Sequence, residues 1–428
     1  MSVPAATPRD TSTALNRFGL GARPNDAMPA DARRWLLDQF ARYQPMPAAW
    51  APLPRTTTHV DTLVAMQRAA RQAGDGEKAA ARQAYRREMR DEYLTAVAAR
   101  MQSALQSDTP FVERLVHFWS NHFAVSVDKL TVIGLAGAFE AEAIRPHVLG
   151  RFEDMLFAAA RHPAMLLYLD QAQSIGPESR AGSAAAARNP QRRRGLNENL
   201  AREIMELHTL GVRSGYTQDD VTEFARALTG WSIAGDFGLP ARLAAGDAGD
   251  PRYPGFQFRS ALHEPGPRTL LGRSYSQGGE AQGRAMLVDL ARAPATAEHL
   301  ATKLARHFAS DEPPPALVRR LAEAFTRTNG DLPSVYRTLV ESPECWAGAT
   351  VKFKSPWDWS VSSLRALGRE EVPAMQVAGL LQQLGQPVWR PGSPAGWDDI
   401  AASWAAPDAL LRRVEAAQRM AGAAARTG

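Results

Sequence analysis

The residues that could do chemistry are densest in one segment, residues 197–231 (NENLAREIMELHTLGVRSGYTQDDVTEFARALTGW). At about 100° per residue of a helix, three glutamates and one arginine fall within a single arc, opposite an apolar face. They are Glu198, Arg202, Glu203 and Glu206. Crowded carboxylates raise one another's pKa, whereas a guanidinium lowers the pKa of the carboxylate that it pairs with. The arc therefore predicts an acid and a base that work at neutral pH, or oxygen ligands for a hard cation.

The same arc has a plain structural interpretation. A surface helix carries charged residues on its solvated face, and Arg202 and Glu206 stand four residues apart, as in a helical ion pair. His208 falls on the apolar side of this helix, which favours a core or interface histidine over a partner of the glutamates. Spacing alone does not separate the two interpretations, so both stay open.

Two histidines, His117 and His122, lie in the segment HFWSNHF. They sit about 140° apart around a helix, so they cannot both ligate one metal ion from a regular helix. His122 shares its face with apolar residues, which predicts a buried ring that needs a hydrogen-bond partner. His117 is expected to face outward with Asn121. His122 is thus a candidate proton carrier or metal ligand, and the alternative is a structural core histidine.

Three further places carry candidate residues. His263 stands beside Glu264 and near Arg268 in HEPGPRTLLG, which is typical of a binding loop and equally of a surface turn. Asp170 ends an apolar run and could line the same space, or be only a polar helix end. Lys354, in VKFKSPWDW, could neutralise an acidic cluster or an anionic substrate.

Helical periodicity dominates the elements that would position these residues. Helices are predicted over residues 61–106 (two, separated near Gly74 and Gly76), from Thr109 and Pro110 onward, near Thr131, and over 152–161, 198–210, 217–230, 297–308, 316–328 and 332–342. We therefore predict a mainly α fold, a large helical bundle that forms a single domain over residues 1–428. Two stretches interrupt it. Residues 178–195 are predicted to be a flexible loop, and the Gly/Pro-rich residues 235–283 a long irregular insert over the candidate site.

Composition limits the kind of protein this can be. Basic and acidic residues, 50 and 45, nearly cancel, so the sequence pI near 9.5 reflects many arginines rather than a concentrated basic field. Cys345 is the only cysteine, which excludes disulfides within the chain and thiolate metal clusters. A divalent metal must therefore be held by nitrogen and oxygen, and the candidate ligands are His122, Glu203, Glu206 and His263. The sequence contains no nucleophile elbow, Walker loop, dinucleotide loop or helical zinc motif.

The first residues of the chain have neither the basic start nor the continuous apolar core of a secretory signal. No stretch of about twenty apolar residues occurs, so no membrane span is predicted. We expect a cytoplasmic location from the sequence as given, and a periplasmic or secreted one where a leader precedes it.

Several segments occur in the order found in a known family: HFWSNHFAVS, HPAMLLYLDQAQSIG, the NEN to TGW block, HEPGPRTLLG and FKSPWDW. Nearly the whole chain, from NRFGLGARP to Gly396 and Trp397, closely resembles the bacterial family catalogued as the domain of unknown function number eighteen hundred. The resemblance implies a mainly helical single domain, a secreted or periplasmic location in many members, and a gene neighbour that looks like a sulfatase or phosphatase relative. It implies no reaction. Glu264 and Arg268 stand where the family usually has aspartate and lysine, which keeps the charge and changes the reach.

Three functions stay open, and the first is an enzyme of hydrolase or transferase type that acts on a polar, carbohydrate or peptide-like substrate. In this hypothesis Glu203 or Glu206 is the general base or a metal ligand. Arg202 holds anionic groups, and His122 and His263 carry protons or bind metal. The residues expected to bind substrate are Asn197, Glu198, Asn121, Asp170, Trp231, Arg268 and Lys354.

The other two functions are not enzymatic. One is a partner or chaperone of the neighbouring sulfatase- or phosphatase-like protein, with the tryptophan-rich C-terminal part as the docking surface. The other is nucleic-acid binding through Arg188, Arg192, Arg193 and Arg194. Four arginines in one loop are usually only solvated, so nucleic acid is the less favoured partner.

Overall fold

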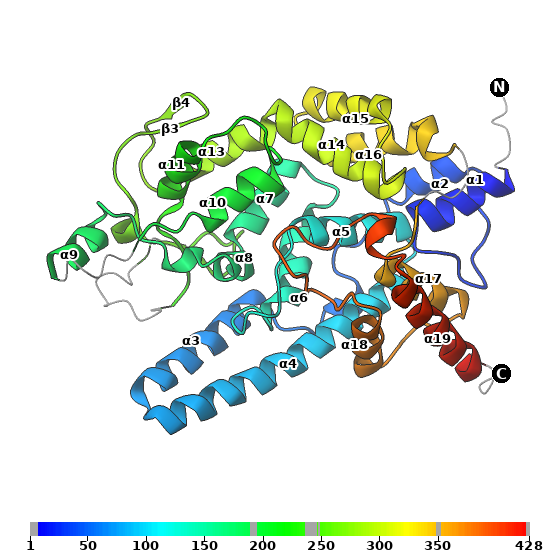
Figure 1. Ribbon diagram of the computed structural model, residues 1–428, viewed down its shortest axis with the longest axis horizontal. Helices are drawn as coiled ribbons and strands as arrows, with labels where there is room; N and C mark the ends of the chain where they lie inside the picture. The colour runs from blue at the N-terminus through cyan, green and yellow to red at the C-terminus, as the bar shows by residue number, and fades with distance from the viewer. Residues whose placement is uncertain (1–6, 189–194, 236–245, 247–248, 348–351, 425–428) are drawn as a thin grey trace.

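The computed structural model describes residues 7–188, 195–235, 246, 249–347 and 352–424, which form a mainly α-helical protein (Figure 1). The structure is 61% helical and its strands form only two short antiparallel pairs, so the predicted fold class is confirmed. Within those ranges, no helix is both long and apolar enough to cross a membrane.

The elements follow one another in this order. The helices before the strands are α1 (Pro8–Thr13), α2 (Ala32–Asp38), α3 (Thr56–Gln72), α4 (Asp75–Gln106), α5 (Pro110–His122), α6 (Leu135–Phe139), α7 (Phe152–Arg161), α8 (Pro163–Tyr168), α9 (Arg180–Arg188), α10 (Asn199–Glu203) and α11 (Gln218–Leu228). The strands are β1 (Trp231–Ile233), β2 (Phe256–Phe258), β3 (Arg268–Leu270) and β4 (Arg273–Tyr275). They are followed by α13 (Glu280–Arg292), α14 (Pro294–Phe308), α15 (Pro315–Arg327), α16 (Leu332–Glu341), α17 (Pro356–Ala366), α18 (Ala374–Gln383) and α19 (Pro407–Ala424).

Helices α3 and α4 form an arm that extends from the body of the molecule (Figure 1). They are separated near Gly74, as predicted, although Gly76 lies inside α4. The part of the arm around Gly74 is largely exposed, whereas residues 96–105 of α4 are mostly buried. The arm is therefore anchored in the core through the end of α4.

Helix α5 runs through the core, and every one of its residues except Asn121 is buried. It begins at Pro110, directly after a threonine, as that pair of residues predicts. Its charged residues tolerate burial because they are paired: Arg145 donates a hydrogen bond of 3.0 Å to Glu113. Since neighbouring elements cover α5 on all sides, the predicted outward orientation of His117 is wrong, and its side chain is only 6% exposed.

In the described part of the stretch 235–283, short strands and one 3-10 turn, Ser260–Leu262, replace long helices, as its glycines and prolines predict. The predicted end of this irregular insert at residue 283 is wrong, because α13 already begins at Glu280. Strand β1 pairs with β2 and β3 pairs with β4, each over three residues. The turn between β3 and β4 uses two residues in the left-handed region, Leu271 (φ 49°) and Gly272 (φ 76°). The polar contacts of this hairpin include Asp220 and Glu223 on α11 and Asp289 on α13, and among the described residues none goes to the arc on α10. Residues 236–245 and 247–248 of the insert lie outside the described residues.

The stretch 178–195 differs from its prediction as a loop, because α9 occupies Arg180–Arg188. The start of this helix is fixed by Ser179, whose hydroxyl accepts a hydrogen bond of 3.0 Å from the backbone N–H of Gly182. An alanine-rich run then continues the helix. Residues 189–194, which include three of the arginines considered for nucleic-acid binding, lie outside the described residues.

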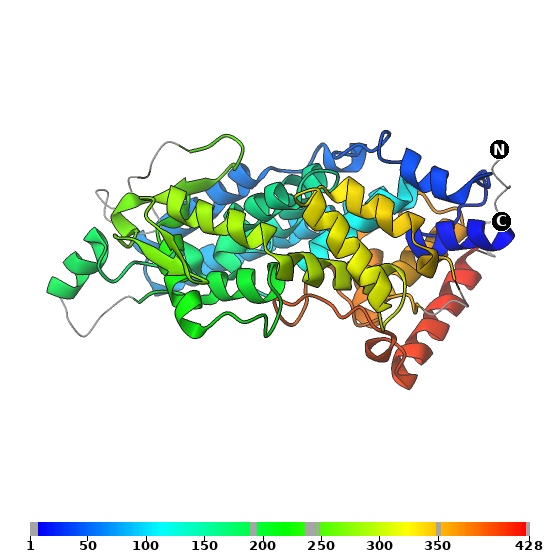
Figure 2. The same ribbon diagram turned by 90° about the horizontal axis from the view of Figure 1, so that it is seen from above.

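The molecule is elongated, and its elements form two groups along the long axis (Figure 2). Helices α7 to α11, α13 and the strands lie towards one end, and α1, α2 and α15 to α19 lie towards the other (Figure 1). One hydrophobic cluster extends from Ala14 to Trp389 and includes side chains of both groups. After α18 the chain turns back across α5 (Figure 1). It is joined there to the segment that follows α5, because the backbone N–H of Val127 donates to the carbonyl of Trp389 at 2.9 Å.

Candidate functional site

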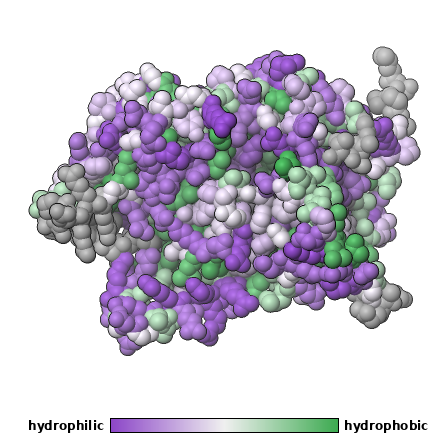
Figure 3. All heavy atoms as spheres, in the orientation of Figure 1, coloured by the Kyte–Doolittle hydropathy of each residue, from purple (hydrophilic) through white to green (hydrophobic). Residues whose placement is uncertain are grey.

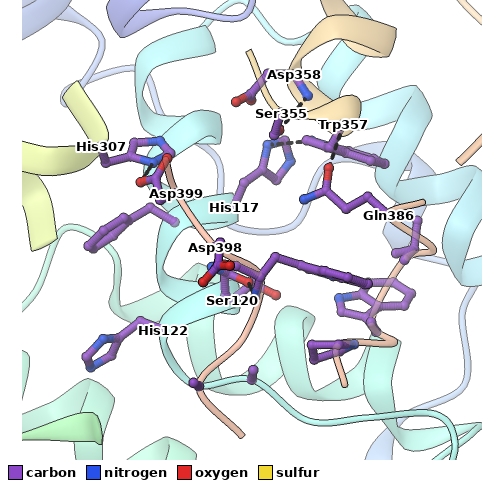
Figure 4. Close-up of a pocket in the computed structure, with 18 of the residues that line it drawn as sticks. His117, Ser120, His122, His307, Ser355, Trp357, Asp358, Gln386, Asp398 and Asp399 are labelled. Carbon is purple, nitrogen blue, oxygen red and sulfur yellow. Dashed lines mark hydrogen bonds and ion pairs between the residues drawn. The ribbon is translucent and has the colours of Figure 1, made fainter. Parts of the chain in front are cut away.

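A cavity of about 590 Å³ lies where several segments of the chain meet (Figure 4). Helix α5 contributes His117, Ser120 and His122, and α14 contributes Lys303, Arg306 and His307. The start of α17 contributes Ser355, Trp357 and Asp358, and the stretch 386–400 contributes Trp389, Trp397, Asp398 and Asp399 among others. These segments are far apart in the sequence, so the cavity exists only in the folded protein.

The stretch 386–400 is held over the cavity by Asn121. The amide nitrogen of Asn121 donates to the carbonyl of Trp397 at 2.8 Å, and its amide oxygen accepts from the Trp397 backbone N–H at 2.7 Å. Gly396 precedes this contact with φ 81°, and a Cβ there would lie 2.3 Å from the Asn121 carbonyl oxygen. Only glycine fits so close to Asn121. The side chain of Asn121 therefore holds the backbone of Trp397 and is not free to bind a ligand.

One wall of the cavity carries a histidine bonded at both ring nitrogens. Nδ1 of His307 lies 2.6 Å from Asp399, and Nε2 accepts a hydrogen bond of 3.1 Å from Nε of Arg114. Because Arg114 can only donate, Nδ1 carries the proton and donates it to Asp399. Burial acts to raise the pKa of Asp399, but His307 and the ammonium of Lys352 outweigh it and hold that pKa well below its usual range. The carboxylate therefore stays ionised and orients the imidazole.

The opposite wall consists of buried ion pairs and indole rings. Glu140 accepts hydrogen bonds from Arg100 at 2.8 Å, from Ser120 at 2.9 Å and from the Trp389 indole at 3.1 Å. The guanidinium of Arg100 lies over the ring of Trp357, 4.2 Å from its centroid, and also contacts that of Trp389. This wall is rigid, because each charged group in it has several fixed partners.

His117 and His122 lie on the cavity side of α5 with different partners. Nδ1 of His117 accepts a hydrogen bond of 3.1 Å from the Trp357 indole, as Figure 4 shows. Nε2 of His122 lies 3.2 Å from the backbone carbonyl of His208, so the predicted burial of His122 and its need for a partner are confirmed. Nδ1 of His122 has no hydrogen-bond partner within the described residues. Burial, and then Lys303, lower the pKa of His122, so the ring is neutral at pH 7.

The arc predicted on residues 198–206 lies elsewhere, on the surface between α10 and α11. Glu198 accepts hydrogen bonds from Arg202, Gln218 and Thr222 at 3.0, 2.8 and 2.8 Å. Burial raises the pKa of Glu203, and its neighbour Glu206 raises it further. In the part of the chain that the structure describes, no residue of this arc lines the cavity.

The backbone explains why helical spacing overestimates the arc. After Glu203 the helix widens to a π-helical turn over Ile204–His208, so residues 204–208 no longer advance by 100°. Glu206 consequently turns to Tyr216, whose hydroxyl lies 3.4 Å from its carboxylate. Over the described ranges, no group of three or more histidine, cysteine, aspartate or glutamate side chains is close enough to hold a metal ion. The described structure therefore gives no support to the predicted metal site of His122, Glu203, Glu206 and His263.

The remaining candidate residues serve as connections between elements. Nδ1 of His263 lies 2.9 Å from the carbonyl oxygen of Thr229, and Asn197 donates to the carbonyl of Leu169 at 3.1 Å. Arg268 pairs with Glu223 at 3.5 Å, and Asp170 pairs with Lys129 at 2.5 Å. Lys354 donates to Asn16 at 3.2 Å, and Trp231 is buried in β1 beneath Arg161. Each contact joins two segments, and none of these residues lines the cavity among the described residues.

Nearly the whole chain matches the model of one protein family. A family model described as "Protein of unknown function (DUF1800)" matches residues 13–427, nearly the whole chain. The chain belongs to the DUF1800 family. No curated protein and no solved structure matches it. Of the segments through which the sequence resembles DUF1800, three border the cavity: HFWSNHF on α5, SPWDW at the start of α17, and Gly396–Trp397 in the covering stretch.

Sequence reasoning missed the residues that make the cavity chemically distinctive in this DUF1800 protein. Lys303, Arg306 and His307 stand within one turn and a half of α14, and Asp398 and Asp399 follow the Gly-Trp pair. The available signal was the basic cluster KLARH at the end of an apolar helix. It was weak, because basic residues near a helix C-terminus have an ordinary explanation in the helix dipole.

Proposed function

We propose that the cavity is the active site of an enzyme of hydrolase or transferase type that acts on a small polar molecule by acid–base chemistry. The observation that carries the proposal is the His307–Asp399 pair, held in a cavity of about 590 Å³ between indole rings. Ligand sites typically have volumes of about 300–1,000 Å³, with apolar walls and a few fixed polar groups. The contact of three DUF1800 segments with the same cavity supports this assignment.

His307 is the proton-handling group in this proposal. A proton taken up at Nε2 makes an imidazolium, which the adjacent Asp399 carboxylate stabilises. Arg114 then gives up its bond to Nε2 and keeps Asp358, which lies 3.5 Å from its guanidinium. Asp399 itself stays ionised, so it orients the ring and does not take the proton.

The test uses small chromogenic substrates and a variant that fills the cavity. Wild-type protein is offered 4-nitrophenyl esters, phosphates, sulfates and glycosides, and release of 4-nitrophenol is followed. Ala395 is exposed and lines the cavity, so Ala395→Trp is expected to abolish the release by occupying the space. Ala402, exposed nearby but outside the lining, gives the control Ala402→Trp. Turnover that survives in Ala395→Trp as well as in Ala402→Trp would contradict the proposal.

A second candidate function, docking of the neighbouring sulfatase- or phosphatase-like protein, has one observation in its favour. Exposed apolar side chains gather on α18 and α19, with Met375 at 59%, Leu411 at 60% and Val414 at 53% exposure, and Figure 3 shows hydrophobic atoms there. The tryptophans do not supply this surface, because Trp357, Trp389 and others are buried in the core and the cavity wall. We expect the neighbouring protein to co-purify with the wild type and with Ala402→Glu, but not with Leu411→Glu.

A further inference from the structure

Lys303 is an unpaired cation inside a cavity whose other charges are nearly all paired. It belongs to α14 and lines the cavity, where the residue is partly buried. Within the described residues it forms no ion pair, and the acid that acts on it most strongly, Asp399, is already paired with His307 and Lys352. A cation that lines a cavity and has no carboxylate partner is a candidate for binding an anionic ligand.

The charges around the cavity balance in number, but they are not all paired. The ion pairs around the cavity are Arg100 with Glu140, Arg114 with Asp358, and Lys352 with both Asp311 and Asp399. Among the described residues, Asp398 is the lining carboxylate outside these pairs, and it is exposed and accepts from Ser403 at 2.8 Å. Lys303 and Arg306 are the lining cations for which the described residues provide no carboxylate partner.

Arg306 adds a second cationic group on the same face of the helix. It stands three residues after Lys303, which places both side chains on one side of α14, and both line the cavity. Its Nε donates to the backbone carbonyl of Asp311 at 3.3 Å, which leaves the terminal guanidinium nitrogens for another acceptor. Two donors so placed can bind two oxygens of one group.

We propose that the substrate of this cavity carries an oxyanion, a carboxylate, phosphate or sulfate group, that binds to Lys303 and Arg306. The inference rests on the proposed function, because it names the substrate class of the same site. The indole rings of Trp357, Trp389 and Trp397 then face the less polar part of the molecule. The anion supplies the partner that Lys303 lacks, and the cationic donors of Lys303 and Arg306 offset the cost of removing the anion from water.

Anion binding to Lys303 is also expected to change the protonation of this residue, which can be measured. Burial lowers the pKa of Lys303 to about 8. The charged and titratable groups that face it are Asp399, Arg306, His122, His208 and His299. Burial lowers the pKa of each of these three histidines, so they stay neutral while Lys303 titrates. An anion beside Lys303 raises its pKa, so anion binding at about pH 8.5 takes up a proton.

The experiment measures sulfate binding to the full chain by isothermal titration calorimetry, in two buffers of different ionisation enthalpy. Wild-type protein is expected to bind sulfate with proton uptake at about pH 8.5, as a lysine with a pKa of about 8 requires. Lys303→Met is expected to weaken binding about tenfold or more and to remove the proton uptake, because a charged hydrogen bond is lost. Lys303→Arg keeps the charge and is expected to restore binding without proton uptake.

The matched control is Lys78→Met, which removes a lysine from the exposed arm and is expected to leave sulfate affinity unchanged. Equal sulfate affinity in wild-type protein and Lys303→Met overturns the inference, and so does the absence of sulfate binding to the wild type. Lys303→Met is expected to fold, since methionine keeps the apolar stem and the described residues form no ion pair with Lys303 that the substitution could break.

Failure of this inference is distinguishable from failure of the proposed function. If Ala395→Trp abolishes turnover while Lys303→Met leaves KM for anionic substrates unchanged, the active site stands and the anion site is wrong. If sulfate binding depends on Lys303 while Ala395→Trp leaves turnover intact, the anion site stands and the proposed active site is wrong.

Discussion

The arc on α10 and the cavity beside α5 contain the same types of residue in different surroundings. In the arc, Glu198 and Arg202 pair across neighbouring turns at the surface, where their side chains are 30% and 38% exposed. In the core behind the cavity, Glu113 and Arg145 pair across two elements with exposures of 2% and 0%. Water screens the first pair and is excluded from the second, so the same residue types have much stronger electrostatic effects in the core beside the cavity.

The comparison shows what helical spacing can and cannot indicate. A periodic pattern finds side chains that share a face of one helix, and it found the arc. It does not find a site whose side chains come from several distant segments. The cavity is such a site, because α4, α5, α14, the start of α17 and residues 386–400 all contribute lining residues.

The largest difference in stability is expected from matched removals of an arginine in each region. Arg145→Met leaves Glu113 buried without its partner, which is expected to lower the free energy of unfolding by about 3–5 kcal/mol. Arg202→Met removes a half-exposed partner of Glu198, with an expected loss of about 0–1 kcal/mol. Urea denaturation of both variants measures the difference. Equal losses in the two variants would show that the core behind the cavity is as solvated as the arc.

Much of the fold was predictable because its signals are local. Thr109 and Pro110 mark the start of α5, and Thr217 and Asp220 form a capping box at the start of α11, where a helix was predicted from residue 217. The break near Gly74 and the helix Phe152–Arg161 were predicted for the same reason. Short-range backbone preferences and caps fix such elements, and these are present in the sequence itself.

The site was less predictable, because its signals are contacts between distant segments. The sequence placed His122 and Asn121 among the candidates, and both line the cavity. It gave His117 an outward orientation because nothing local shows that α17 covers that face, where the indole of Trp357 donates to His117. The pairing of His307 with Asp399 spans 92 residues, so no local pattern could indicate it.

A chemical difference is expected between lysines inside and outside the cavity. Burial lowers the pKa of Lys303 to about 8, so its neutral amine becomes abundant as the pH rises through that value. Lys303 is therefore expected to be acylated by a small reagent with a midpoint near pH 8. Mass spectrometry of protein labelled at several pH values measures this, with exposed Lys78 as the reference. Labelling of Lys303 only after denaturation would mean that the cavity is closed to small molecules.

A smaller effect is expected from the arc, where burial and Glu206 raise the pKa of Glu203. A carboxyl with a raised pKa in the folded state destabilises the protein above that pKa, and the penalty disappears as the pH falls below the unfolded value. Glu203→Gln is therefore expected to stabilise the protein by a few tenths of a kcal/mol at neutral pH, after screening by water. Below about pH 4 the wild type and the variant should be equally stable. Unfolding at both pH values tests this, and destabilisation by the variant at neutral pH would show that Glu203 makes a favourable contact.

The most direct test of the central claim compares one carboxylate-to-amide substitution in each region, using any substrate that the wild type turns over. Asp399→Asn removes the charge that orients His307 and is expected to lower kcat about 10²-fold to 10⁴-fold. Glu203→Gln, in the arc, is expected to leave kcat unchanged. Loss of turnover in Glu203→Gln with full activity in Asp399→Asn would contradict the account and place the active site on the arc.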